Sequence, residues 1–92
     1  MADGGVRHDA ARRRFELEEA GATGFLTYTR KEGRIVFTHT IVPPELEGRG
    51  IAGRIVRTGL DFARAEGLVV VPQCSFVRAW IDRHEEYRDL LA

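Results

Sequence analysis

The sequence lacks a second cysteine, a net charge and any long hydrophobic run. The single cysteine, Cys74, excludes a disulfide within these 92 residues and a metal cluster held by several cysteines. Fourteen basic and fourteen acidic side chains cancel, so no overall field attracts nucleic acid or an anionic membrane. No apolar run approaches the roughly 18 residues that a membrane span needs, and residues 1–14 contain no apolar leader. These absences predict a cytoplasmic protein with no nucleic-acid, membrane or metal partner.

The composition that remains is that of a soluble globular domain. Hydrophobic residues make up 43% of the chain and charged residues 30%, and 92 residues suit one domain. Residues 1–11 show no hydrophobic periodicity. We therefore expect a mobile N-terminal lead-in over residues 1–11 and a single domain over residues 12–92.

Three segments have the alternating or β-branched pattern of strands, at residues 14–18, 25–29 and 34–42. A short connection containing Gly33 makes the last two an antiparallel hairpin. Within residues 34–42 the alternation places Ile35, Phe37, His39 and Ile41 on one face. Two prolines then end the strand.

The spacing of apolar residues changes after the prolines. Residues 51–66 carry an apolar stripe at steps of three and four, which predicts an amphipathic helix that stops at Gly67. Residues 68–71 are continuously apolar, as in a central strand covered on both faces. Ser75 can cap a second helix. The order predicts an α+β fold in which the third and fourth strands are parallel, with ligands beyond their carboxyl ends.

The segment from Gly48 to Gly53 lies between the third strand and the first helix. Its three glycines permit close ligand approach, and the free amides of the first helical turn attract phosphate, to which Arg49 can add a charged contact. An ordinary flexible turn explains the same glycines. The P-loop alternative fails because neither a lysine nor a Ser or Thr directly follows Gly53.

Two side chains in the same region can take part in catalysis. Cys74 precedes a helix, whose dipole favours the thiolate, so it is a candidate nucleophile or proton carrier. His39 projects from the strand that leads to the same end and is a candidate base or orienting group. Each also has a structural explanation, Cys74 as a small core residue and His39 as a satisfied strand residue.

Four blocks in order resemble the minimal acetyltransferases of the GNAT superfamily. The similarity covers about residues 13–91, and the blocks are His39-Thr40-Ile41-Val42-Pro43, Glu47-Gly48-Arg49-Gly50-Ile51-Ala52, Val71-Pro72-Gln73-Cys74-Ser75-Phe76-Val77 and Ile81-Asp82-Arg83-His84-Glu85-Glu86-Tyr87. The resemblance implies an acetyl-CoA-binding fold: three antiparallel strands, a helix, a parallel fourth strand splayed from the third, and a C-terminal helix.

The resemblance also implies a set of binding residues for acetyl-CoA. The pantetheine arm would enter between the splayed strands, and the pyrophosphate would lie on the glycine segment. The residues implied are Ile41 and Val42 through their main chain, the segment Gly48, Arg49, Gly50, Ile51, Ala52 and Gly53, and, in the tail block, Arg83, His84 and Tyr87. Cys74 matches the cysteine that this family presents near the thioester. Glu47 departs from the superfamily, which has Arg or Gln there.

The expected function is an N-acetyltransferase that moves an acetyl group from acetyl-CoA to an amine. Either Cys74 forms an acetyl-cysteine, or the amine attacks directly while Cys74, His39 or water takes the proton. The alternative is a non-catalytic CoA-binding or protein-interaction module on the same fold. The acceptor is left open between a protein or peptide lysine and a small polyamine, and the oligomeric state is not predicted.

Overall fold

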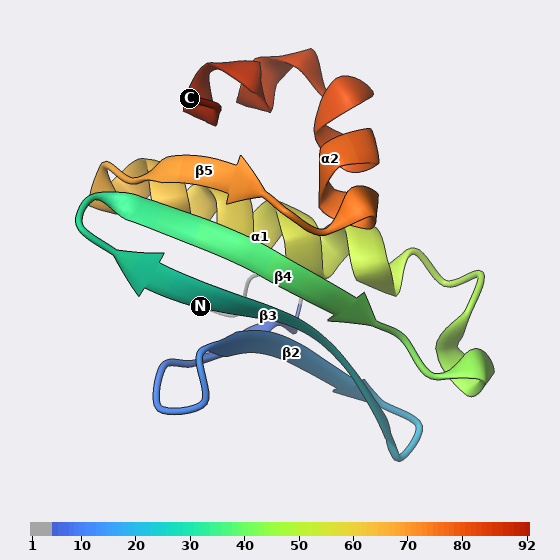
Figure 1. Ribbon diagram of the computed structural model, residues 1–92. Helices are drawn as coiled ribbons and strands as arrows, with labels where there is room; N and C mark the ends of the chain where they lie inside the picture. Colours follow the sequence, from blue (N-terminus) through green and yellow to red (C-terminus); the bar gives the residue numbers. More distant parts are fainter. Residues whose placement is uncertain (1–4) are drawn as a thin grey trace.

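A five-stranded sheet with the order β1-β2-β3-β4-β5 forms the centre of the protein in the computed structural model, which describes residues 5–92 (Figure 1). The first four strands are antiparallel neighbours, and β4 and β5 run parallel. The predicted α+β arrangement with a parallel last strand is therefore confirmed. The strands are β1 (Arg7–Asp9), β2 (Arg14–Glu19), β3 (Ala22–Lys31), β4 (Arg34–Ile41) and β5 (Val69–Pro72).

Helix α1 (Ile51–Glu66) covers one face of this sheet and leaves the other face open (Figure 1). It ends at Gly67, which has the left-handed conformation predicted for a C-terminal stop. The buried stripe packs on the sheet, and Gly59 lets α1 approach closely: a Cβ there would lie 3.1 Å from the Phe37 ring. The buried residues of the helix are Ile51, Ile55, Val56, Gly59, Leu60 and Ala63.

The C-terminal elements pack against α1 and β5. They are α2 (Ser75–Asp82) and the 3-10 helix η2 (Glu85–Leu90), and a further 3-10 turn, η1 (Pro44–Leu46), precedes α1. Tyr87 of η2 donates a hydrogen bond to Asp61 at 2.7 Å and accepts one from Arg57 at 3.1 Å, both on α1. This pair of bonds holds η2 to α1. None of the helices within residues 5–92 combines the length and the apolar character needed to cross a membrane.

The structure differs from the predicted mobile lead-in over residues 1–11. Residues 1–4 lie outside the described part of the chain, but Arg7–Asp9 forms β1 and pairs with β2. His8 of β1 stacks on Phe15 and lies 2.6 Å from the Tyr28 hydroxyl. Three residues are too few to show an alternating pattern, so only these contacts with distant residues reveal the strand.

A second correction concerns the last strand, which was predicted to be central. β5 lies at the edge of the sheet, and beyond it the only pairing among the described residues is a bridge between Val70 and Leu91. Val70 faces the core and is 1% exposed, whereas Val69 is 37% exposed. Residues 68–71 are all apolar for a different reason from the one predicted. Helix α1 covers one face of β5, and the C-terminal elements pack along its outer edge, so the second face need not be covered.

A β-bulge in the pairing of β3 with β4 overturns the predicted faces of β4. The register changes between Thr27 and Tyr28, so that β4 has one extra residue opposite them. Phe37 is fully buried before the bulge, but Ile41 is 47% exposed after it. His39 is also exposed. The extra residue reverses the alternation of faces along β4. Ile35 and Phe37 therefore face α1, whereas His39 and Ile41 face the opposite side of the sheet.

Candidate functional site

The strands β4 and β5 separate halfway along β4, and the site lies where they part. Their parallel pairing ends at Phe37 and Pro72, while β4 continues to Ile41 (Figure 1). The Cys74 amide donates the last bond across the gap, to the Phe37 carbonyl at 2.9 Å. Beyond this bond the chain turns out of the sheet and begins α2 at Ser75 (Figure 1).

The thiol of Cys74 faces this separation. Thr40 on β4 brings its hydroxyl to 3.3 Å from Cys74 Sγ. Burial by itself raises the pKa of the thiol, but the Thr40 hydroxyl and the backbone amides of Val77, Phe76 and Thr40 outweigh it, so the pKa of Cys74 lies below its ordinary value. Hydrogen-bond donors stabilise the thiolate more than the thiol. The site therefore favours a reactive sulfur.

The position of Cys74 at the start of α2 explains these donors. The residue before the first helical turn is Cys74, with an extended backbone, and not Ser75, which was predicted as the cap. The amides of the first turn have no partners within the helix, and those of Phe76 and Val77 favour the thiolate. The lowered pKa of Cys74 is therefore due to its place before the first turn of α2 as well as to Thr40.

An apolar cavity of about 280 Å³ lies close to the thiol: neither Cys74 nor Thr40 lines it, but Phe76 and Val42, each two residues further along the chain, do. Three elements meet around it: the end of β4, the loop that precedes α1, and the first turn of α2. Its walls are mainly aliphatic or aromatic, and Glu47 is the single ionisable residue among those that line it. The lining residues are Val42, Leu46, Glu47, Gly48, Gly50, Ile51, Ala52, Gly53 and Phe76.

The glycine segment supplies main-chain donors to one side of this cavity. Gly48 and Gly50 have φ values of 80° and 72°, and nothing lies within 4 Å of the place a Cβ would take at either. The first bond within α1 runs from the Arg54 amide to the Gly50 carbonyl, so the amides of residues 51–53 have no partner in the helix. This arrangement suits an anion and leaves room for one.

Gly53 has a structural explanation of its own. A Cβ at this position would lie 3.2 Å from Nε1 of Trp80, which is buried on α2. The missing side chain therefore lets α1 and α2 approach each other. The glycine at the end of the segment is required for helix packing whether or not a ligand binds.

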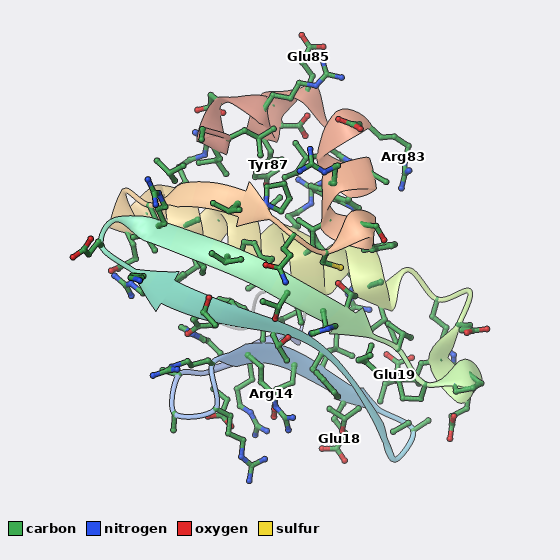
Figure 2. All side chains as sticks on the ribbon, viewed as in Figure 1. Arg14, Glu18, Glu19, Arg83, Glu85 and Tyr87 are labelled. Atoms are coloured by element: carbon green, nitrogen blue, oxygen red, sulfur yellow. The ribbon has the colours of Figure 1, made fainter. Side chains whose placement is uncertain are left out.

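Arg49 points away from the cavity. Its guanidinium forms an ion pair with Glu19 at 2.8 Å, and Glu19 lies at the end of β2 (Figure 2). Both side chains are well exposed, so the pair contributes no more than about 1 kcal/mol. The structure does not bring Arg49 to the amides of its own loop.

His39 and Cys74 are not brought together either. Neighbouring strand residues point to opposite faces, and Thr40 faces Cys74. His39 consequently lies on the open face of the sheet, where its side chain is exposed. The two candidate catalytic groups lie on opposite sides of the gap.

The tail residues also separate into different roles. His84 stacks on Trp80 at 3.6 Å and donates from Nδ1 to the Trp80 carbonyl at 2.7 Å. Tyr87 is buried against α1, whereas Arg83 projects from the end of α2 into solvent (Figure 2). None of the three lines the cavity. His84 and Tyr87 hold the C-terminal elements in place, and Arg83 is exposed to solvent.

Three residues of the site were not singled out from the sequence. Thr40 contacts the thiol, and Leu46 and Phe76 line the cavity. Thr40 lies 34 positions from Cys74 along the chain, so no local pattern connects them. Leu46 had a signal, since it is an isolated apolar residue in a loop of Pro, Glu and Gly, and such a residue is commonly buried.

Comparison with known proteins agrees with this geometry. A sequence model of the GCN5-related N-acetyl-transferase family matches residues 14–90. The chain is 34% identical over 79 residues to the protein NATD1 of Mus musculus, covering 83% of this chain and 72% of that protein. It has the same identity to NATD1 of Homo sapiens, of which it covers 70%. The solution structure of a GCN5-like protein from Staphylococcus aureus has a similar fold, with a TM-score of 0.75 and 23% identity over 100% of this chain and 91% of the other. This chain therefore belongs to the GCN5-related N-acetyltransferase family.

Proposed function

We propose that the protein is an acetyl-CoA-dependent N-acetyltransferase that uses Cys74. The observation that carries this proposal is a thiol of lowered pKa where β4 and β5 separate, next to an apolar cavity that ends at unpaired amides. Family membership supports the same reaction. A free thiol requires a reducing compartment, which favours the cytoplasm.

The cavity fits the chemistry of coenzyme A. Its aliphatic walls suit the pantetheine arm, whose amides would bond the main chain of Ile41 and Val42 as they would a neighbouring strand. The amides from Gly48 to Gly53 suit the pyrophosphate. Arg49 would have to leave Glu19 to contact a phosphate, and Arg83 is exposed enough to reach an outer one.

Two routes transfer the acetyl group. In the first, the Cys74 thiolate attacks the thioester carbonyl, a new sulfur–carbon bond forms, and CoA leaves as a thiolate. The amine then attacks the acetyl-cysteine, the carbon–nitrogen bond forms, and Cys74 is released. In the second, the amine attacks acetyl-CoA directly, the carbon–nitrogen bond forms, and CoA leaves as a thiolate, while the Cys74 thiolate takes the proton that the nitrogen gives up.

His39 is suited to a role on the acceptor side. An amine must lose a proton before it attacks, and His39 lies on the open face, away from the acetyl-CoA cavity. A neutral imidazole has a ring nitrogen that can accept that proton. In this scheme Cys74 acts on the acetyl donor, and His39 takes the proton from the acceptor amine.

The test combines binding with mass spectrometry. Calorimetric titration with acetyl-CoA is expected to show binding, and mixing the two is expected to add one acetyl mass to the wild-type protein. Cys74→Ala should bind acetyl-CoA and gain no acetyl group on the direct mixing. Full turnover by Cys74→Ala on an amine panel would overturn the role of Cys74 in both routes.

A non-catalytic CoA-binding module is the second candidate. Glu47 favours it, because a carboxylate lines the cavity where the superfamily has Arg or Gln. Micromolar binding of acetyl-CoA without transfer to any amine would support the module. Absence of binding would contradict both functions.

A further inference from the structure

The sheet face that α1 leaves open offers a second surface where β4 and β5 separate (Figure 1). The proposed acetyl-CoA cavity lies on the α1 side, because residues of α1 and the loop before it line it. On the open face, β4 borders the gap with His39 and Ile41, which alternate with the inward-facing Thr40. On β5, Val71 alternates with the buried Val70 and is paired with Val36, just before the two strands separate.

The residues of the two chain segments that border this gap include no carboxylate and no lysine or arginine. Residues 37–42 and 69–76 contain only His39 and Cys74 as titratable side chains. The next acidic residue across the sheet is Glu16, in the row Ile41, Phe25, Glu16. Glu16 is 4% exposed, and its two oxygens are held by Arg7 and Arg14. Glu16 is therefore already paired, and the exposed Glu18 on the same face of β2 lies in the next row, beyond the end of β4.

The same border carries exposed apolar surface. Ile41 is 47% exposed, and Phe25, its partner in register on β3, is half-buried beside it. Directly paired side chains on a sheet are in contact, so Ile41 and Phe25 form one apolar platform. Arg14 packs over the Phe25 ring at 4.7 Å and closes its far side. The platform is therefore a small, bounded surface next to the gap.

We propose that the acceptor is an amine carried by a polypeptide, and that an apolar residue beside this amine packs on the platform of Ile41 and Phe25. The inference rests on the proposed N-acetyltransferase function. A polyamine brings further ammonium groups, and the borders of the gap have no carboxylate to pair with them. A single lysine or N-terminal amine loses its one charge on deprotonation, and its apolar neighbour gains contact with the platform.

The first arm of the test compares acceptors of defined charge. Two short capped peptides carry one lysine each, flanked by leucine in one and by glycine in the other, and spermidine is the third acceptor. Release of CoA and the mass of the product report transfer. We expect kcat/KM to be about tenfold higher for the leucine-flanked peptide than for the glycine-flanked one, and lowest for spermidine. A preference for spermidine would overturn the inference.

The second arm uses the two large hydrophobic residues that are exposed among residues 5–92, Ile41 and Val69. Ile41→Ser should abolish the preference for leucine, measured as the ratio of kcat/KM for the two peptides, in which any change in acetyl-CoA binding cancels. Val69→Ser, at the other end of β5, should keep the preference. Equal effects of the two substitutions would contradict a platform at Ile41.

The calorimetric titration separates failure of this inference from failure of the proposed function. Binding of acetyl-CoA and transfer to peptides with no effect of the flanking residue would overturn the acceptor inference alone. Binding without transfer to any of the three acceptors would overturn it and favour the non-catalytic module. No binding of acetyl-CoA would overturn both the inference and the proposed function.

Discussion

The two halves of β4 differ although they form one continuous strand. From Arg34 to Phe37 the strand is paired on both edges, by β3 and by β5. From Thr38 to Ile41 it is paired with β3 only. The first half holds the core, and the second half presents a hydroxyl to Cys74 and exposed side chains to solvent. A strand thus changes from a structural to a chemical role where one neighbour leaves it.

The bulge makes this change possible. Without the extra residue in β4, the alternation would turn Thr40 away from the α1 side and place His39 in the core position after Phe37. With it, Thr40 meets Cys74 and His39 reaches the open face. The two halves can therefore be tested separately, because substitutions in one should affect stability and those in the other should affect reactivity.

The largest expected effect is on the paired half. Phe37→Ala removes a fully buried ring from between α1 and the sheet and should lower the free energy of unfolding by about 3–5 kcal/mol. Thr38→Ala, the first residue of the other half, loses one hydroxyl contact to Thr27 and should cost about 1 kcal/mol. Urea unfolding measures both, and equal losses would remove the distinction between the halves.

A smaller loss of stability is expected for Gly59→Ala. The added methyl would lie 3.1 Å from the Phe37 ring and 3.2 Å from Leu26, so the core must shift. Overpacking of this kind costs about 1–3 kcal/mol, which exceeds the gain of about 1 kcal/mol from replacing a helical glycine. Thermal unfolding followed by circular dichroism checks this prediction. A raised melting temperature would show that α1 does not pack tightly at Gly59 against the paired half of β4.

Thr40→Val tests the divergent half through the thiol. The substitution keeps the shape and removes the hydroxyl at 3.3 Å from Cys74 Sγ, so the pKa of Cys74 should rise toward its ordinary value. The thiolate fraction at neutral pH then falls, and the rate of alkylation by iodoacetamide should drop about fivefold, the equivalent of one hydrogen bond of about 1 kcal/mol. The pH at which alkylation reaches half its maximum should move upward.

Thr38→Val is the matched control for that experiment, because its hydroxyl contacts Thr27 at 2.6 Å and not the thiol. It should leave the alkylation profile unchanged. A fall in both variants would mean that the hydroxyl of Thr40 has no specific influence on Cys74.

The smallest expected effect concerns the cavity beside the divergent half. Glu47→Gln removes the carboxylate that lines it and should lower the dissociation constant of acetyl-CoA about two- to threefold, since one exposed charge pair is worth less than about 1 kcal/mol. Glu45→Gln, two positions away and not in the lining, should have little effect. Titrations at low and high salt should show the difference shrinking as salt rises.

Most of the fold was predictable because its signals are local. The helix over residues 51–66, its stop at Gly67 and the parallel last strand all follow from periodicity, glycine and proline. β1 was missed, and β5 was placed centrally instead of at the edge. In both cases the deciding contacts join residues that are far apart in the sequence, and a short pattern cannot report them.

The candidate site was predictable in part. The glycine segment and Val42 do meet around one cavity, and Cys74 lies next to it. Arg49 is paired with Glu19, and Tyr87 is bonded to Asp61, because each has a nearer partner of suitable charge or polarity than any ligand site. Which partner a side chain such as Arg49 or Tyr87 bonds depends on the distances between residues in the folded chain, and residue type alone does not define these distances.

By itself the sequence determined the longer elements and their order, the family, and the presence of one thiol near one glycine-rich turn, since apolar period, glycine, proline and cysteine act locally. Only the tertiary structure decided where β4 and β5 part, which residues of β4 face the thiol, and that His39 faces the other way. These features follow from a single extra residue in one strand and from packing across 34 positions of chain. Such long-range geometry is a property of the folded molecule as a whole.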